Sequence, residues 1–427
     1  MPEAIDQPAR RQPANTPRIF IACVAVCAAA SLILLLLVIG SPAHPVYDEA
    51  WFLGTLDILK RNGVSVIFLR ELPGAPGPTF TLVYGAVQHL FALELPWLRL
   101  VNVTLLGGCV VLLAAIFKTA QTSLPALSGR QSAWLAAGVF VTLPTVAVSS
   151  GMTLTEIPAM FFMLIFVYAS MLGVAATDVK YAALWSVLAG LALGMAVLGR
   201  QNYLVAIAAL IVLPAWPIKP LRLLFPMLAA LVAALLFMPV FAIWGGLLPR
   251  SVAYAASHLS PFYGVLSLGY FGLIAALVAP GLFTPMLRHK RDLWIAVAFG
   301  LLVTVTTGAS FVPMHAFASR LSPDMQALLG RLVVFALSGL ACAFVFAFVR
   351  HLIENRDDGL IRFSGAALFL GVLSNARIYE FSSRYVFVFL PFLLIAVANL
   401  IKPNWHLPPR LAIAAGIGLM SLVSYLY

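Results

Sequence analysis

Residues 19–40 read IFIACVAVCAAASLILLLLVIG, and this stretch decides the fold class. It holds no charged side chain and is long enough to cross a hydrocarbon core of about 30 Å as a single helix. Apolar stretches of similar length recur to the end of the chain, separated by short polar gaps. Because backbone polar groups in lipid must be hydrogen-bonded within their own segment, these stretches predict helices rather than open sheets.

The composition excludes an ordinary soluble protein. Hydrophobic residues make up 62% of the chain, charged residues 10%, and the mean hydropathy is +1.02. We therefore expect an all-α, polytopic integral membrane protein, with residues 1–427 forming a single transmembrane domain. In a soluble protein the net charge of +11 would suggest a nucleic-acid partner, but here the basic residues sit between apolar runs and report topology instead. We expect a membrane partner and no nucleic acid.

The basic residues orient the first helix. Arg10, Arg11 and Arg18 precede residues 19–40, so we expect a cytoplasmic N-terminus and a retained anchor that leads outward. The next apolar stretch, 78–93, is short, contains polar side chains and follows a Pro-Gly-rich segment, so we expect it to lie along the membrane surface. Residues 41–96 are then a first outer loop with interfacial helices.

With that choice, most of the 26 Lys and Arg residues fall on the inner side, as the positive-inside bias favours. Letting 78–93 cross would invert every later segment. With 78–93 along the membrane surface, the N-terminus lies inside and the C-terminus outside. The expected location is a bacterial inner membrane. The thirteen spans lie at about 19–40, 97–117, 131–149, 157–175, 182–199, 201–216, 223–244, 262–284, 293–311, 331–349, 360–376, 385–400 and 411–427.

Asp48 and Glu49 follow the first span directly, at the outer interface. One interpretation is helix capping, because acids favour the first turn of a helix. The other is catalysis: two adjacent carboxylates repel each other, which favours one of them taking a proton from a hydroxyl group. We take Asp48 and Glu49 as candidate catalytic residues.

Glu156 lies between the third and fourth predicted spans with no basic residue close in sequence. It too could cap a helix, with Pro158 in the first turn. The alternative is a second acid of the same outer site, which orients an acceptor hydroxyl or serves as the base itself. We add Glu156 to the candidate catalytic residues.

Among the basic residues that this topology leaves on the outer side, against the positive-inside bias, three arginines are candidates for a site: Arg200, Arg377 and Arg384. Each could simply extend its guanidinium to the interface. Their shared level also suits binding of a lipid phosphate, since a guanidinium holds phosphate with forked hydrogen bonds. The histidines at this level lack ligand spacing, so we expect no metal site and no cofactor, although a divalent metal could bridge a phosphate and the acids.

Taken in order, these features resemble the GT-C class of membrane glycosyltransferases, and more closely the eukaryotic α-1,2-glucosyltransferases that use dolichyl-phosphate-glucose to add the last glucose of the lipid-linked oligosaccharide. The Ala- and Leu-rich composition suggests a bacterial relative. The resemblance adds five supporting residues: Tyr47, Gln201, Asn202, Glu380 and Tyr385. The segments that carry it are Tyr-Asp-Glu at 47–49, Pro-Gly-Pro-Thr-Phe at 76–80, Leu-Arg-Leu-Val-Asn at 98–102, Thr-Glu with Met-Phe-Phe at 155–162, Arg-Gln-Asn at 200–202, and Glu, Arg-Tyr and Pro at 380–391.

The resemblance implies an inverting transfer of a sugar, with glucose expected, from a polyprenyl-phosphate donor to a saccharide or lipid-linked acceptor on the outer face. Compared with the family pattern, one residue is missing after Gln201 and two are inserted before Arg384. The rival functions are a transporter or flippase of a lipid-linked sugar, and a non-catalytic membrane scaffold. Transporters place polar groups near the midplane on broken helices and often repeat their halves, and neither pattern is evident here.

Overall fold

The structure is a computed structural model, and within the ranges it describes the chain is helical, with no strand. This confirms the predicted all-α, polytopic membrane class. Arg10, Arg11 and the last part of the predicted 201–216 span lie outside the described residues. The described ranges are 16–74, 76–122, 127–212, 220–249, 251–252, 259–312, 321–378 and 380–427.

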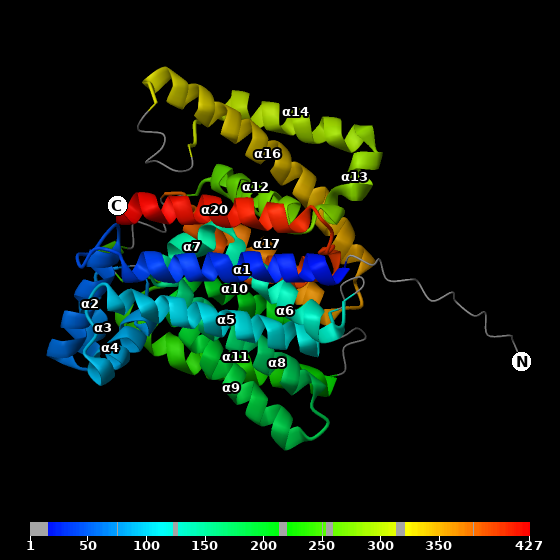
Figure 1. Cartoon of the computed structure of the whole chain (residues 1–427). Coiled ribbons are helices and arrows are strands. Elements are labelled where there is room, and N and C mark those ends of the chain that lie inside the picture. The colour runs from blue at the N-terminus through cyan, green and yellow to red at the C-terminus, as the bar shows by residue number, and fades with distance from the viewer. Residues whose placement is uncertain are drawn as a thin grey trace, which may run out of the picture.

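Ten long helices form the body of the bundle (Figure 1): α1 (Thr16–Ile39), α5 (Leu100–Thr119), α8 (Glu156–Ala175), α9 (Val179–Gly199), α11 (Pro220–Trp244), α12 (Pro261–Val278), α14 (Lys290–Thr307), α16 (Pro323–Glu354), α17 (Gly359–Asn375) and α20 (Leu407–Leu426). The shorter helical elements are α2 (Glu49–Asn62), α3 (Val66–Glu71), α4 (Thr79–Phe91), η1 (Trp97–Arg99), α6 (Gly129–Val139), η2 (Phe140–Thr142), α7 (Pro144–Gly151), η3 (Gln201–Leu204), α10 (Val205–Ala209), η4 (Leu210–Val212), η6 (Pro280–Phe283), α13 (Thr284–Arg288), α18 (Ser383–Phe387), α19 (Leu390–Val397) and η7 (Ala398–Leu400).

Each of the thirteen predicted spans overlaps a helical segment. Among the described residues, eight helices are long and apolar enough to cross a membrane. A ninth candidate is the pair Gly129–Thr142 and Pro144–Gly151, which is bent by 70°. The bend falls at Pro144, which lacks an N–H donor and holds the residue before it in an extended conformation. Three further apolar helical segments are shorter: Gln201–Val212, Gly359–Asn375 and Leu390–Leu400. Helix α14 is not among the eight, and it begins with the charged triplet Lys290, Arg291 and Asp292.

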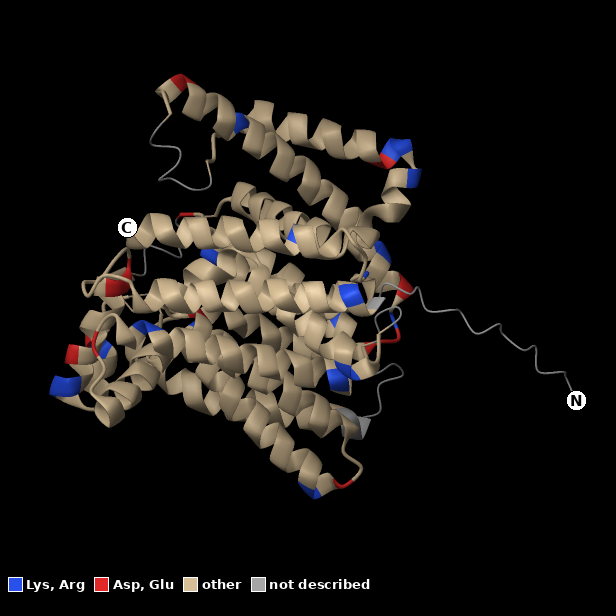
Figure 2. Cartoon of the chain, in the orientation of Figure 1, with Lys and Arg blue, Asp and Glu red and all other residues tan. Residues whose placement is uncertain are grey.

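The bundle has two distinct ends. Figure 1 shows α2, α3 and α4 together at one end, near the end of α20, whereas α1 begins at the opposite end. The Tyr427 hydroxyl donates to the Gly40 carbonyl at 2.7 Å, which ties the end of α20 to the end of α1. Figure 2 shows most charged residues near these two ends and few along the middle of the bundle. The segment after α1, with Asp48, therefore lies at the end where the chain finishes.

Helix α4 covers most of the predicted interfacial stretch 78–93. Its 13 residues rise about 20 Å, which is too short to cross a core of about 30 Å. The helix packs against α2, and the Thr79 hydroxyl at its start donates to the Met195 carbonyl of α9 at 2.6 Å. At Gly77 the chain passes so close to the Leu198 carbonyl that a β-carbon would clash with it. The segment before α4 is thereby fixed against the end of α9.

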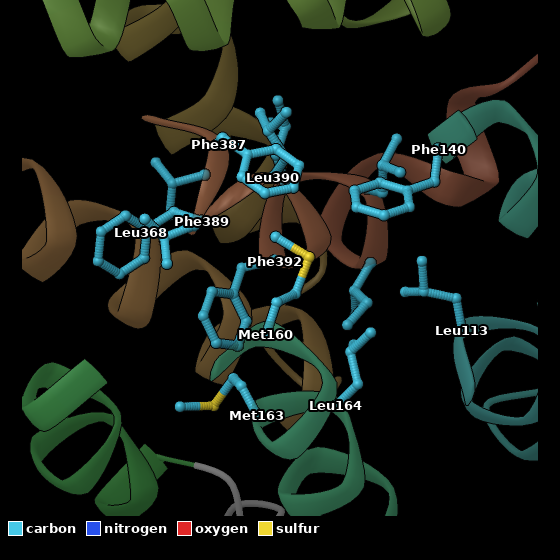
Figure 3. Close-up of a cluster of buried hydrophobic side chains, with 14 of the residues drawn as sticks. Leu113, Phe140, Met160, Met163, Leu164, Leu368, Phe387, Phe389, Leu390 and Phe392 are labelled. Carbon is cyan, nitrogen blue, oxygen red and sulfur yellow. The ribbon is translucent and has the colours of Figure 1, made fainter. Parts of the chain in front are cut away.

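A buried core joins the helices that carry charged residues at this end. Helix α19 is buried along its whole length, so it is apolar on every face. Figure 3 shows Leu390 and Phe392 of this helix in one cluster with Met160 and Met163 of α8 and Leu368 of α17. Helix α8 begins one turn before Met160, and α18 leads directly into α19. Packing in this core therefore fixes where both α8 and α18 begin.

Helices α9 and α11 approach each other through small residues. A β-carbon on Gly190 would lie 2.6 Å from the Ala229 carbonyl oxygen and from the Val232 β-carbon, and one on Gly194 would lie 2.7 Å from the Leu236 side chain. Glycines spaced four apart let two membrane helices pack closely, and dispersion between the helices then stabilises the pair.

We expect Gly190→Leu to lower the thermal unfolding midpoint of the detergent-solubilised protein, because the added side chain pushes α9 from α11 at a cost of roughly 1–3 kcal/mol or more. Gly107→Leu is the matched control, since a β-carbon on Gly107 meets nothing within 4 Å and the residue is exposed. Equal midpoints for the two variants would contradict this packing.

Candidate active site

Glu156 is the centre of a charged cluster. It is the first residue of α8 and fully buried, and its Oε1 accepts hydrogen bonds from Arg200 and, at 2.8 Å, from Arg384 Nε. Thr155, the residue before the helix, makes no side-chain capping bond. The acid therefore does more than favour a helix start: it holds two guanidinium groups from distant parts of the chain at one oxygen.

Arg384 connects Glu156 to the first loop. Its Nη1 donates to Asp48 Oδ2 at 2.5 Å, and its guanidinium carbon lies 5.3 Å from the centre of the Tyr47 ring. Burial raises the pKa of the Tyr47 hydroxyl, and Arg384 only partly opposes this, so Tyr47 stays protonated at neutral pH. Tyr47 also has a positive φ of 51°, an uncommon conformation for a bulky residue that aims its ring at Arg384.

Asp48 directs its carboxylate into the cluster rather than along α2. It precedes α2 but makes no side-chain capping bond. Its side chain is 45% exposed, in contrast to the buried Glu156. Asp48 is thus the acid of the cluster that a substrate could reach from outside.

Arg200 completes the cluster from the end of α9. Its guanidinium carbon lies 5.9 Å from the centre of the Tyr385 ring, and its side chain is 11% exposed. Two buried polar atoms in the cluster, Arg200 Nε and Glu156 Oε2, have no hydrogen-bond partner in the part of the chain that is described. Two acids and two arginines balance formally, so a ligand phosphate would have to compete with the acids for the arginines.

Two of the other predicted site residues, Asn202 and Tyr385, are linked to each other through Asn375. Asn202 Nδ2 donates to Asn375 Oδ1 at 3.3 Å, and Asn375 Nδ2 donates to the Tyr385 carbonyl at 3.3 Å. Gln201 is half-buried beside Asn202 at the start of η3. The segments that follow Arg200 and Arg384 are thus linked through Asn375 of α17.

Arg377 and Glu380 lie apart from the cluster. Both are exposed, and the described residues include no ion pair for either. Of the three arginines predicted to bind phosphate, two are brought together and Arg377 is not.

Glu49 has a different setting from the one its sequence position suggested. Its two carboxylate oxygens accept from Arg99 Nε at 2.8 Å and Nη2 at 2.6 Å, and both side chains are fully buried. They also accept from the backbone N–H groups of Val46 at 2.9 Å and Thr153 at 2.7 Å. Glu49 therefore does not support Asp48 by direct contact: it anchors the loop that carries Asp48.

Arg99 is the residue that sequence reasoning did not assign to the site. Beyond Glu49, it donates to the Ser41 hydroxyl at 2.7 Å, to the Pro42 carbonyl at 2.6 Å and to the His44 carbonyl at 2.9 Å. It thus binds almost the whole turn between α1 and α2. Its acid lies fifty positions earlier in the chain. The available signals were an arginine at the start of an apolar span and its place in the Leu-Arg-Leu-Val-Asn segment at 98–102, and neither pointed to Glu49.

The described residues contain no group of three His, Cys, Asp or Glu side chains placed to hold a metal ion. In the cluster itself, the two acids are bridged by Arg384. The chemistry that these side chains offer is therefore a carboxylate near the surface beside two guanidinium groups, an arrangement suited to a proton acceptor next to an anion.

We expect Glu49→Gln and Arg99→Met each to cost about 3–5 kcal/mol of unfolding free energy, because each leaves a buried charge unpaired. The double variant should lose less unfolding free energy than the two single variants lose together. Denaturant unfolding in detergent measures this coupling. Arg350→Met is the control, since its ion pair with Glu354 is 54% exposed on both sides and contributes at most about 1 kcal/mol. A Glu49→Gln protein of normal stability would argue against an anchoring role.

Residues 71–253 match the family model described as PMT, dolichyl-phosphate-mannose-protein mannosyltransferase. No curated protein matches. Among solved structures, ArnT from Cupriavidus metallidurans in the apo state is 16% identical with a TM-score of 0.45, covering 97% of this chain and 78% of that one.

ArnT from the same organism bound to undecaprenyl phosphate is 12% identical, with a TM-score of 0.46 and the same coverage. The archaeal oligosaccharyltransferase AglB from Archaeoglobus fulgidus, in complex with an inhibitory peptide and a dolichol-phosphate, is 14% identical with a TM-score of 0.42. That alignment covers 88% of this chain and 50% of AglB. The chain thus carries a segment that matches the PMT family, within an all-helical membrane protein.

Proposed function

We propose that the protein is an inverting glycosyltransferase that moves a hexose from a polyprenyl-phosphate donor to an acceptor hydroxyl on the outer face of the membrane. The observation that carries this proposal is Arg384, which hydrogen-bonds to Asp48 and Glu156 at once and stands beside Arg200. The proposal is supported by the proximity of these four side chains, which the sequence analysis took as candidate base, second acid and phosphate-binding residues.

The two arginines would hold the donor phosphate. A guanidinium presents several N–H groups in one plane, and a phosphate oxygen pair can accept two of them. Arg200 and Arg384 approach the same carboxylate oxygen, so they are close enough together to share one phosphate, and Arg200 Nε still has a hydrogen to donate. As the bond to the sugar breaks, negative charge grows on the phosphate, and fixed cations stabilise that charge most strongly in the transition state.

Asp48 would act as the base. The acceptor oxygen forms a bond to the anomeric carbon, the carbon–oxygen bond to phosphate breaks, and its electron pair leaves with the phosphate. The acceptor proton passes to Asp48, and displacement from the opposite face inverts the anomeric configuration. A phosphate on Arg384 competes with Asp48 for the guanidinium, so arrival of the donor would free the base at the moment it is needed.

Glu156 would position the arginines. Two guanidinium groups repel each other, and a buried carboxylate between them offsets that repulsion. With Oε1 occupied by both arginines, the remaining Oε2 could accept from an acceptor hydroxyl and so orient it. Asp48 is therefore a better candidate base than Glu156.

For the donor sugar we propose a hexose, and for the acceptor a hydroxyl group, without fixing either one more closely. The sequence resemblance favours glucose, whereas the PMT family description names mannose and a protein acceptor. Both sugars are polyprenyl-phosphate-linked hexoses, and the charged cluster recognises the phosphate that they share. We propose glucose as the first donor to test, with mannose as the second.

The arrangement of the two ends of the bundle supports a site on the outer face of the membrane. Asp48, Arg384 and the end of α20 lie at the end of the bundle opposite the start of α1. With the predicted cytoplasmic N-terminus, the site faces the periplasm of a bacterial inner membrane. Residues 41–96 are then the first outer loop within a single transmembrane domain of residues 1–427.

We expect Asp48→Asn to lower turnover of polyprenyl-phosphate glucose or mannose by roughly a hundredfold to ten-thousandfold, because the amide accepts no proton. Asp57→Asn is the matched control, an exposed acid of α2 with the same change of charge. Transfer is measured with radiolabelled sugar and purified protein. Movement of intact donor across proteoliposomes without cleavage of the sugar–phosphate bond would contradict a transferase and favour a flippase.

We expect Arg384→Lys to slow transfer by roughly a hundredfold, because lysine keeps the charge but loses the forked donors. Arg70→Lys, at an exposed position of α3, should leave the rate unchanged. Initial rates at several donor concentrations separate binding from turnover. Rates for Arg384→Lys equal to wild type would remove this residue from the phosphate site.

A further inference from the structure

Asn102 holds the backbone that leads into α8. It lies one turn after Arg99, near the start of α5, and is fully buried. Its Nδ2 donates to the Met152 carbonyl at 2.7 Å and to the Leu154 carbonyl at 3.0 Å, with the Ser149 carbonyl at 3.4 Å. A carboxamide nitrogen carries two hydrogens, so the two short bonds use both of them. One side chain thus fixes the connection between α7 and α8.

Glu156 follows this connection directly. Met152, Thr153 and Leu154 are fully buried, and Thr155 makes no side-chain capping bond to α8. A helix start without a side-chain cap is placed by the groups that surround it. The hydrogen bonds from Asn102 are contacts of this kind, so the position of Glu156 depends on them.

The same connection also contacts the first loop. The Thr153 N–H donates to Glu49 Oε1 at 2.7 Å, and Glu49 is paired with Arg99. Arg99 and Asn102 are three positions apart in one continuous helical stretch, so their side chains lie on the same side of it. One turn of one helix therefore holds both the loop that carries Asp48 and the segment that leads to the second acid.

The distance between the two acids is bridged by Arg384. Its Nη1 donates to Asp48 Oδ2 at 2.5 Å and its Nε to Glu156 Oε1 at 2.8 Å. The guanidinium group is planar and rigid, so it cannot lengthen to follow an acid that moves. If the start of α8 shifted by about 1 Å, the bond to Glu156 would leave the hydrogen-bonding range.

A buried asparagine in a membrane helix can also serve only to join helices, because its amide hydrogen-bonds across the interface. The arrangement of Asn102 is narrower than that. All of its acceptors lie within residues 149–154, and its Oδ1 has no partner among the described residues. The carboxamide is therefore oriented by the segment before Glu156.

We propose that Asn102 is a positioning residue of the charged cluster, which holds Glu156 at the distance from Asp48 that Arg384 bridges. Asn102 touches no reacting atom and acts through Glu156, which in turn places Arg200 and Arg384. This inference rests on the proposed function and extends it to the side chain that sets the geometry of the phosphate site.

The test combines binding with turnover in purified protein in detergent. Equilibrium binding of short-chain polyprenyl phosphate gives a Kd without turnover, and sugar transfer gives a rate. The variants are Asn102→Leu and Asn102→Ser, each alone and combined with Glu156→Gln. A serine side chain is too short to reach the carbonyls, so Asn102→Ser removes the bonds without adding bulk.

Asn355→Leu is the matched control. The Asn355 Nδ2 also donates to a backbone carbonyl, that of His351, at 2.8 Å. It lies at the end of α16, on the side of the bundle where α1 begins (Figure 1), so it is remote from the charged cluster.

We expect Asn102→Leu and Asn102→Ser to weaken binding of polyprenyl phosphate by about threefold to tenfold. Transfer should slow by roughly tenfold to a hundredfold, because Arg200 and Arg384 move with Glu156. Asn355→Leu should keep the wild-type Kd and rate. In the Glu156→Gln background, either Asn102 variant should change the Kd by less than about twofold, because the carboxylate through which it acts is gone. A purely structural role would lower the thermal midpoint without this dependence on Glu156.

Wild-type Kd and rate in both Asn102 variants would overturn the inference. Equal losses in the Asn355→Leu protein would also overturn it, as would the same loss from Asn102→Leu with and without Glu156→Gln. Failure of the proposed function looks different, because polyprenyl phosphate would then bind with the expected coupling while the wild-type protein transfers no sugar.

Discussion

The arrangement depends on one guanidinium group. Arg384 pairs with Asp48 from the loop after α1 and with Glu156 at the start of α8, partners that lie 336 and 228 positions away in the chain. A charge at the edge of a bilayer is costly unless it is paired, so this contact draws three distant segments together. The apolar core around α19 holds α18 and α8 in place, and the Arg99–Glu49 pair holds the first loop. Each of these supports serves to keep two acids and two arginines within hydrogen-bonding distance.

Much of the fold could be predicted from the sequence because the signal is local. A run such as 19–40 must form a helix wherever it lies in the chain, and the length of each run sets whether it can cross the membrane. The 70° bend between α6 with η2 and α7 was not predicted, although Pro144 marks it in hindsight. Short segments such as η3 with α10 and η4 were predicted as spans, but their own length does not decide whether they cross.

The site was only partly predictable, and the reason is pairing at a distance. Acids and arginines in outer loops signalled a polar site, and Asp48, Glu156, Arg200 and Arg384 do meet. Adjacent acids in the sequence suggested that Asp48 and Glu49 act together, yet successive residues at the start of a helix point in different directions, and only one reaches Arg384. Arg377 has the same chemistry as Arg384 and lies seven residues before it, but it is exposed. No local pattern distinguishes Asp48 from Glu49, or Arg384 from Arg377. The difference lies in which distant segment packs against each residue.

In the proposed mechanism, a donor phosphate takes Arg384 from Asp48 and so frees the base. A structure of the protein with polyprenyl phosphate bound tests it most directly. We expect the phosphate within hydrogen-bonding distance of Arg200 and Arg384, with Asp48 released from the guanidinium and Glu156 still in place. Phosphate bound elsewhere, with the Arg384–Asp48 ion pair intact, would contradict it.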